Sequence, residues 1–378
     1  MSLPAFAECR PFALGIELEL QIVNRHDYDL APQAPDLLRA LQRSALPGRF
    51  AGRTTRFSVE LATEICSGHA EALAHLRELR DALCQAADRL DVGICGGGTH
   101  LFNARPAAPR GAGSPPPTLA QLWPELGRQS ALFGQHVHIG CPGPDQALVL
   151  MQGLGRFVPH LIALAASSPY EGGVDGGFDS LRQRTLSAFP LVGRAPFVLR
   201  WSEFEADFDR KARTGVVEGL DDVHWDLCPQ PATGAIELRV LDAPLTVEKA
   251  AALAAYVQCL ARWLRIERPF EKLLEPGAFD DVVYVFNRFQ ACRFGLDATF
   301  LDPSTHERRT LRDDVKASFD ALELHAMELR AEDAIRFLRF ELAEGGNDAA
   351  WIRNGVAREG LLAEVVRQQC VRFEGGVP

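Results

Sequence analysis

Two glutamates at alternate positions are the first residues of this sequence that suggest chemistry. Glu17 and Glu19 lie in the segment FALGIELELQIV at 12–23, where apolar and polar residues alternate. Side chains two residues apart on a β-strand project from the same face, so the two carboxylates are expected side by side. They repel each other at neutral pH unless water or a cation separates them. A solvated sheet face is the simpler alternative, and this pair alone does not exclude it.

Three further strand-like segments repeat the arrangement. His136 and His138 share a face in GQHVHIG. Glu60 lies in the middle of FSVELAT, and Glu237 and Arg239 share a face in AIELRV. Four strands that each place an acid or an imidazole on one side are hard to explain as solvated surface. On one concave sheet, these groups would suit a hard divalent cation, which takes oxygen ligands and an imidazole.

The histidines and the arginine have alternative interpretations. A strand histidine is often a hydrogen-bonded packing residue, and Cys141 in HVHIGC could supply a thiolate to zinc. Because the remaining candidate ligands are carboxylates, magnesium or manganese is favoured over zinc. Arg239 is placed to meet a phosphate that bridges the metal, and an ion pair with Glu237 is its structural alternative.

Two other segments are weaker candidates. Arg288 and Arg293 in NRFQACRFG are candidate anchors for ATP or for a substrate carboxylate, with surface ion pairing as an equal alternative. The glycines of GGGTH at 96–100 lack the context of a dinucleotide site and the lysine of a Walker A loop. We interpret them as a tight strand exit where glycine lets the backbone approach a ligand.

The elements that must position these groups alternate in type. Strands are predicted at 12–23, 57–65, 135–139 and 235–241, and helices at 70–90 and from the N-cap Thr246 to about 265. Two or three helices are predicted from about 311, interrupted by Gly345 and Gly346. Loops are predicted at 105–117 and 168–177. Without regular βαβ spacing, this pattern predicts an α+β fold on a largely antiparallel sheet.

Composition narrows the class of protein. The 378 residues carry 50 acidic and 40 basic side chains, a formal charge of −10, which argues against a nucleic-acid or anionic-membrane partner. The apolar stretch at 148–166 contains Arg156, Pro159 and His160, so a buried helix kinked near Pro159 is predicted rather than a membrane span. No signal peptide is recognisable, and nine cysteines without a CxxC pair are typical of reduced thiols in the cytoplasm.

Taken together, the motifs resemble a known family. The chain is similar to the bacterial glutamate–cysteine ligase type 2 family, in particular to a group described as carboxylate–amine ligases. The resemblance runs from about residue 12 to 345 with the motifs in the same order, and it rests on GIELEL (15–20), SVELAT (58–63), GGGTHLF (96–102), FGQHVHIG (133–140), ASSP (166–169), AFP (188–190), GAIELRVLDAPLT (234–246), NRF (287–289) and ACRFG (291–295).

The resemblance implies a glutamine-synthetase-like catalytic domain, with helices on the outer face of a curved sheet. We expect one catalytic domain over 1–378, with a core at about 10–345 and a helical C-terminal segment from about 311. The resemblance also implies ATP, two or more magnesium ions, and phosphate contact by Arg239. Metal ligands implied by it are Glu17, Glu19, Glu60, Glu237 and one histidine of the pair His136 and His138, a choice that the motifs leave open.

Two positions depart from the family pattern. Arg53 stands where the family usually has an acidic residue seven positions before Glu60. Cys228 in WDLCP stands where the family usually has an arginine. A missing carboxylate would weaken metal binding, and a missing cation would alter the hold on a substrate carboxylate or phosphate.

The resemblance implies an ATP-dependent ligase that joins a small carboxylate to an amine, both expected to be amino acids, through an acyl phosphate. Arg239 and Glu60 are the residues expected to act in catalysis, and a homodimer would be unsurprising. One alternative is a phosphotransferase that stops at the phosphorylated substrate. A second is a nucleotide- or amino-acid-binding protein that has lost turnover, and a third is a zinc hydrolase.

Overall fold

The computed structural model describes residues 3–42, 46–52, 55–103, 131–275 and 277–376. Arg53 and the loop predicted at 105–117 lie outside these ranges. All nine cysteines lie within them, and all nine are free thiols.

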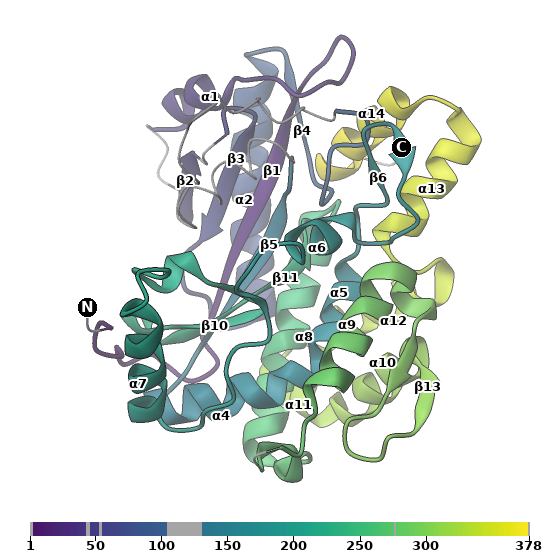
Figure 1. The fold of residues 1–378 in the computed structure, drawn as a ribbon. Coiled ribbons are helices and arrows are strands. Elements are labelled where there is room, and N and C mark those ends of the chain that lie inside the picture. The colour runs from purple at the N-terminus through teal and green to yellow at the C-terminus, as the bar shows by residue number, and fades with distance from the viewer. Residues whose placement is uncertain (1–2, 43–45, 53–54, 104–130, 276, 377–378) are drawn as a thin grey trace, which may run out of the picture.

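A seven-stranded sheet forms the centre of the fold (Figure 1). Its order is β10-β11-β5-β1-β3-β2, and β4 pairs with the end of β1. Every pairing in this sheet is antiparallel, as predicted. Its strands are β1 (Leu14–Asn24), β2 (Gly48–Gly52), β3 (Ser58–Thr63), β4 (Val92–Cys95), β5 (Gly134–Gly140), β10 (Leu227–Gln230) and β11 (Ala235–Asp242).

Alternation along β1 gives the sheet one apolar face. Ile16, Leu18 and Leu20 are at most 1% exposed, and they belong to the main hydrophobic core. Helices α2 (His69–Asp88) and α8 (Val247–Ile266) pack on this face. They confirm the helices predicted at 70–90 and from Thr246 to about 265. The side chain of Thr246 accepts a hydrogen bond from the backbone N–H of Lys249, so it caps α8 as predicted. The polar side chains of the same strands must therefore face away from these helices.

The C-terminal region contains more helices than the sequence predicted. Five helices follow residue 310, because the turns at Leu322 and Arg330 use neither glycine nor proline. Arg330 adopts a left-handed conformation with φ of 53°, which few sequence rules anticipate. The remaining helices are α1 (Ala34–Leu41), α4 (Pro144–Leu154), α5 (Val158–Ala165), α6 (Leu181–Leu186), α7 (Trp201–Ala212), α9 (Asp281–Phe294), α10 (Leu311–Ala321), α11 (Glu323–Leu329), α12 (Glu332–Glu344), α13 (Asp348–Glu359) and α14 (Leu362–Phe373).

Short elements connect these helices and strands. The loop predicted at 168–177 contains a small hairpin, β6–β7. The short strands are β6 (Tyr170–Glu171), β7 (Val174–Asp175), β8 (Val192–Gly193), β9 (His224–Trp225), β12 (Thr299–Leu301) and β13 (Arg308–Thr310). The 3₁₀ turns are η1 (Gly155–Phe157), η2 (Leu220–Asp222), η3 (Pro231–Thr233), η4 (Glu271–Leu274) and η5 (Gly295–Asp297).

The apolar stretch at 148–166 is a core element. Pro144–Ala165 is long and apolar enough to cross a membrane by length and composition, but 89% of its apolar window is buried inside the fold. It is interrupted at Gly155–Phe157, directly before the first turn of α5 that contains Pro159, so the predicted kink near Pro159 is confirmed. Pro159 lies in the first turn of α5, where its missing N–H costs no helical hydrogen bond.

The glycines after β4 serve the fold. A Cβ atom on Gly96 would overlap the carbonyl oxygen of Pro244, and one on Gly98 would approach the carboxylate of Asp242 within 2.6 Å. Gly97 has φ of 106°, a conformation that L-residues rarely adopt. The backbone here approaches the connection between β11 and α8. This contact within the protein, rather than the predicted approach to a ligand, accounts for the glycines.

Gly96→Ala is therefore expected to destabilise the fold. The added methyl group must displace backbone, so we expect the free energy of unfolding to fall by about 2–3 kcal/mol. Gly219→Ala is the matched control, because its backbone is extended and the nearest described atom to its added methyl group, the backbone nitrogen of Asp221, would lie 3.9 Å away. Urea denaturation of both variants measures the difference, and equal stability would show that the contact at Gly96 is easily relieved.

Candidate functional site

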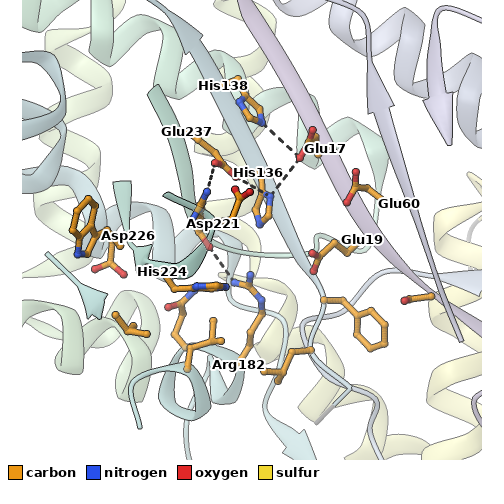
Figure 2. A pocket seen from close by; sticks show the side chains of 18 of the residues that line it. Glu17, Glu19, Glu60, His136, His138, Arg182, Asp221, His224, Asp226 and Glu237 are labelled. Carbon is orange, nitrogen blue, oxygen red and sulfur yellow. Dashed lines mark hydrogen bonds and ion pairs between the residues drawn. The ribbon is translucent and has the colours of Figure 1, made fainter. Parts of the chain in front are cut away.

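The register of three neighbouring strands brings the predicted polar residues together. Glu17 on β1 lies opposite His136 on β5, and His138 on β5 lies opposite Glu237 on β11. Residues directly opposite each other in an antiparallel pair share a face of the sheet. Carboxylates separated by 220 positions in the chain therefore flank one pair of imidazoles (Figure 2).

These side chains line a cavity of about 530 Å³ on the polar face of the sheet. Both sides of the cavity carry charge, with carboxylates and imidazoles on the sheet and further groups on the segments between α6 and β10 (Figure 2). Its described lining consists of Glu17, Glu19, Arg49, Thr55, Phe57, Ser58, Glu60, Leu132, Phe133, His136, His138, Arg182, Gln183, Leu186, Val192, Asp221, His224, Trp225, Asp226, Gln230, Glu237 and Arg239.

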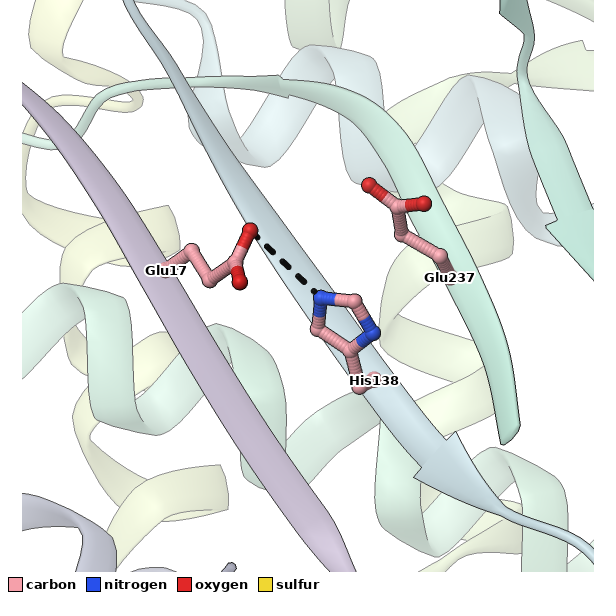
Figure 3. A group of neighbouring side chains, drawn as sticks. All are labelled: Glu17, His138 and Glu237. Atoms are coloured by element: carbon pink, nitrogen blue, oxygen red, sulfur yellow. Dashed lines mark ion pairs between the residues drawn. The ribbon is translucent and has the colours of Figure 1, made fainter. Parts of the chain in front are cut away.

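Glu17, His138 and Glu237 form a group suited to a metal ion. One ligand atom from each of the three lies within 4.8 Å of the others (Figure 3). Two carboxylates and an imidazole are the donor set of a hard or borderline divalent cation. Cys141, the thiolate considered for a zinc site, is 1% exposed and belongs to the hydrophobic core instead. The donor set therefore fits magnesium or manganese, and it groups His138 rather than His136 with the two glutamates.

His136 lies between the same two carboxylates. Its Nδ1 is 3.1 Å from a carboxylate oxygen of Glu237 and 3.5 Å from one of Glu17. Burial would lower the pKa of His136, but its hydrogen bonds to both glutamates and their charges raise that pKa to about 9. Burial would likewise raise the pKa of Glu17 and of Glu237, and their contacts with the histidines bring both pKa values below the ordinary range. In the metal-free protein, a protonated His136 thus offsets two negative charges.

This arrangement predicts a pH-dependent stability of the metal-free protein. The folded-state pKa of His136, about 9, lies above its ordinary value of 6.5, so its contribution is complete below pH 6.5 and is lost as the pH rises to 9. We expect the free energy of unfolding to decrease over that window by at most about 3 kcal/mol. Urea denaturation with a chelator at several pH values measures this decrease. His136→Gln should lack it, and an identical slope in the variant would contradict the assignment.

The second pair of carboxylates lies one strand further along. Glu19 on β1 is opposite Glu60 on β3, and both are at most 7% exposed. The carboxylate of Glu19 accepts a hydrogen bond of 2.8 Å from the backbone N–H of Gly134. The guanidinium of Arg49 on β2 lies 3.1 Å from Glu17 and 3.8 Å from Glu60. The four predicted acidic ligands therefore lie in one cavity.

Arg49 is a site residue that sequence reasoning missed. It lies on β2, a five-residue edge strand whose sequence GRFAG shows no alternation of acids. Its side chain is 62% exposed, so it is free to move away from the carboxylates when a cation binds there. Only the pairing of β2 with β3 places this arginine above the acidic residues.

The side chain of Arg239 on β11 is held by two hydrogen bonds within the protein. Its guanidinium donates to the carboxylate of Glu237 at 2.7 Å and to the carbonyl oxygen of Val223 at 2.8 Å. Burial would lower its pKa, and the neighbouring Cys228 and Glu237 raise that pKa above its ordinary value. The predicted ion pair with Glu237 is therefore present. The same guanidinium lines the cavity, where it would also face a ligand.

The side of the cavity opposite the acidic residues was not predicted. Arg182 on α6 donates to the carbonyl oxygen of Leu241 at 3.1 Å, and its guanidinium fills space that a Cβ on Gly134 would occupy. His224 on β9 has a pKa lowered to about 3 by burial and by the charges of Arg239 and His136. It is neutral at physiological pH. These residues lie on a helix of six residues and a strand of two, which are too short to carry a periodic signal.

The structure does not bring Arg288 and Arg293 into this cavity. Arg288 on α9 is 8% exposed and donates to Asp226 at 2.8 and 3.0 Å. It also donates to Gln183 and Ser187, so its donors are committed within the protein. Arg293 lies over the ring of Phe178, with 4.7 Å between the guanidinium carbon and the ring centroid. Both arginines belong to α9, which lies on the far side of Asp226.

The departure at Cys228 lies next to the acidic residues. Cys228 on β10 is opposite Glu237 and fully buried. Burial raises the pKa of its thiol to about 12, so it remains neutral and supplies no cation where the family usually has one. Gln230, two residues further along the same strand, donates a hydrogen bond to Glu237. The effect of Arg53 on the site lies outside the described residues.

Comparison with solved structures identifies the class of fold. The chain superimposes on the glutamate–cysteine ligase of Francisella tularensis in complex with AMP with a TM-score of 0.64, over 98% of this chain and 90% of that one at 14% identity. A bifunctional glutathione synthetase from Pasteurella multocida gives a TM-score of 0.61 over 97% of this chain and 51% of that one at 12% identity. These likenesses concern the fold, which is the α+β fold of the glutamine-synthetase-like ligases, as predicted.

Sequence comparison defines the family. The family model described as "Glutamate-cysteine ligase family 2 (GCS2)" matches residues 13–368, and the chain belongs to this family. Over 99% of both chains, 58% of residues are identical to a protein of Leptothrix cholodnii named "Putative glutamate--cysteine ligase 2". A protein of Azoarcus sp. with the same name is 50% identical over 100% of this chain and 99% of its own. The predicted family is thereby confirmed.

Proposed function

We propose that this protein is an ATP-dependent ligase, similar to glutamate–cysteine ligase, that forms an amide through an acyl phosphate. One observation carries the proposal: Glu17, His138 and Glu237, from three adjacent strands, place their ligand atoms within 4.8 Å of one another in a charged cavity. A solvated sheet face would not gather mutually repelling carboxylates at such short distances.

The donor set supports a metal site on the sheet side of the cavity. Glu17, Glu237 and His138 would hold one ion, and Glu19 with Glu60 would contribute to a second, while His136 remains an alternative ligand. Bound magnesium or manganese would neutralise phosphate charge and orient ATP for in-line transfer. Arg49 would leave the carboxylates when the cation arrives, because its side chain is exposed and its ion pairs are weak.

The reaction has two steps. An oxygen of the substrate carboxylate attacks the γ-phosphorus of ATP, ADP leaves, and an acyl phosphate forms. Arg239, held by Glu237 and Val223, would stabilise the negative charge that spreads over the transferred group. The amine then attacks the acyl carbon, inorganic phosphate leaves and a proton is lost, which gives the amide. Glu60 is the carboxylate that we propose to accept this proton.

The family name suggests glutamate as the acid and cysteine as the amine, and we propose amino acids as the substrate class. We also propose that the protein is cytoplasmic and forms one catalytic domain, and a homodimer is compatible with this proposal. We propose no nucleic-acid or membrane partner.

Product analysis tests the proposal. Purified protein is incubated with ATP, magnesium and pairs from a panel of amino acids, and ADP, phosphate and amide are quantified by mass spectrometry. We expect one ADP and one phosphate for each amide, and no sustained phosphate release without the amine. ADP formed with a stable phosphorylated acid and no need for an amine would identify a phosphotransferase. Activity that needs zinc and no nucleotide would identify a hydrolase.

A binding protein without turnover is the second candidate. The buried neutral thiol of Cys228 opposite Glu237 favours it, because the family usually has a cation there. This candidate predicts that ATP binds with magnesium in a calorimetric titration while no acid and amine pair in the panel yields ADP.

A further inference from the structure

A second cavity of about 700 Å³ lies behind the first. Val192 and Trp225 line both cavities, and the ion pair between Asp226 and Arg288 separates them, since Asp226 lines the first and Arg288 the second. Its described lining consists of Phe178, Arg184, Ser187, Leu191, Val192, Gly193, Arg194, Ala195, Pro196, Phe197, Lys211, Trp225, Asp281, Tyr284, Val285, Arg288, Phe289 and Cys292.

The lining combines apolar groups with positive charge. Its four cationic side chains, Arg184, Arg194, Lys211 and Arg288, face a single carboxylate in the described lining, that of Asp281. This balance contrasts with the formal charge of −10 on the whole chain. Because three of these cations pair with carboxylates, the positive charge left for a ligand is that of Arg184, which favours an anionic group.

Of the four cations, Arg184 alone has no carboxylate partner among the described residues, and Arg194 keeps donors beyond its ion pair. Lys211 is paired with Asp207 and Arg288 with Asp226, so both are already neutralised. Arg184 is exposed, stacks on the ring of Phe178 at 5.6 Å and makes no ion pair with any described residue. Arg194 pairs with Asp281 at 2.8 Å and bonds the carbonyl oxygen of Phe279 through one terminal nitrogen, and it lies over the rings of Phe279 and Tyr284; no described hydrogen bond uses its other terminal nitrogen.

The mouth of the cavity exposes large apolar side chains. Val285 and Phe289, one turn apart on α9, are 64% and 51% exposed. Phe178 packs edge-on against Phe289 at 6.0 Å, so the two rings form one apolar surface beside Arg184. Exposed aromatic surface next to an available guanidinium recognises a ligand with a ring at one end and an anionic group at the other.

We propose that this second cavity binds a small organic anion that carries an aromatic or branched apolar group. The carboxylate of such a ligand lies between Arg184 and Arg194, and its apolar part lies against Phe178, Phe289 and Val285. The volume is that of ordinary small-molecule sites, and the apolar lining with a few charged groups is typical of them. The site is distinct from the first cavity and does not depend on the function proposed for it.

The wall between the cavities shows how the two sites are connected. The carboxylate of Asp226 accepts hydrogen bonds from the hydroxyl of Tyr284 at 2.6 Å and from Arg288 at 2.8 Å. Both donors belong to α9 and line the second cavity, while Asp226 lines the first. A ligand in the second cavity therefore touches the groups that hold a carboxylate of the first.

Calorimetric titration with 3-phenylpropionate tests the proposal. We expect one site per chain, with both the neutral amide 3-phenylpropionamide and the ring-free acid propionate binding at least about tenfold more weakly. Arg184→Gln should weaken binding of 3-phenylpropionate by about tenfold, since the variant loses a charge-assisted hydrogen bond. Arg336→Gln on α12 is the matched control, because it removes an exposed arginine that does not line the cavity, and it should bind as the native protein does.

Glu237→Gln tests which of the two cavities holds the probe. That variant alters the first cavity and leaves the second intact, so 3-phenylpropionate should bind to it with unchanged affinity. Absence of binding to the native protein, or equal binding by Arg184→Gln and the native protein, would overturn the proposal. Loss of binding in Glu237→Gln would place the probe in the first cavity and overturn it equally. None of these results depends on whether the protein turns over ATP.

Discussion

Glu237→Gln is expected to reduce amide formation by about 1000-fold or more, equivalent to about 4 kcal/mol of transition-state stabilisation. Glu237 is 5% exposed and contacts His136, Gln230 and Arg239, so its charge is shared by the whole cluster. Glutamine keeps the volume and one acceptor oxygen but removes the charge that a divalent cation requires. The change should therefore affect function far more than folding.

The measurement combines steady-state turnover with thermal denaturation. We expect the Tm of the metal-free variant to stay within a few degrees of the native value, since one hydrogen-bonded polar group replaces another at a cost of about 1–2 kcal/mol. Magnesium and ATP should raise the native Tm and leave that of the variant nearly unchanged. Glu248→Gln at the start of α8 is the control, because Glu248 pairs with Arg77 outside the cavity. Parallel losses of Tm and activity in Glu237→Gln would mean that Glu237 is structural.

Arg239→Ala is expected to lower kcat/KM by about 100-fold or more. Its guanidinium is the cation of β11 that lines the cavity, and it is fixed by Glu237 and the Val223 carbonyl. A cation already fixed in place stabilises charge that develops in phosphoryl transfer without reorganisation during the reaction. The alanine variant should also lose about 1–3 kcal/mol of stability, because Glu237 loses one of its donors and the carbonyl of Val223 loses the guanidinium that bonds it.

Arg239→Lys separates these two effects. Lysine keeps the charge but lacks the planar fork that holds Glu237 and Val223 together, so we expect activity between the native and alanine values. Assays well below the Tm of each variant remove any contribution from unfolding. Arg77→Ala, which removes an arginine paired with Glu248 outside the cavity, should leave kcat/KM unchanged. Native kcat/KM in Arg239→Ala would show that the arginine only supports Glu237.

The alternation of residues determined which side chains face the cavity. The pattern in GIELEL, SVELAT, GQHVHIG and AIELRV assigned Glu17, Glu60, His136, His138 and Glu237 to the polar faces of strands, and the structure places all five in one cavity. A strand has a side-chain period of two whatever its partners are, so a short segment contains this information. The helices at 69–88 and 247–266 followed from local spacing and capping in the same way.

The contacts between segments that are distant in sequence were decided by the tertiary structure. Nothing in the local pattern specifies that β5 lies between β1 and β11, the order that brings Glu17 and Glu237 to one pair of histidines. Arg49 and the wall formed by Asp226 and Arg288 depend equally on which elements pack together. The position of Arg288 likewise depends on partners that lie about 60 and 100 positions away along the chain, so no local pattern specified it, and its role as an anchor stays a prediction.

The sequence alone therefore determined the four strands that carry the predicted site residues, the helices on their apolar face, the face on which each acid lies and, by resemblance, the family. Only the tertiary structure decided which faces meet, how closely the carboxylates approach, and that α9 places Arg288 against a second cavity. The physical reason is the range of the interactions along the chain, because backbone geometry and alternation act over a few residues. Strand order and ion pairing depend on side chains that meet only when the whole chain has folded.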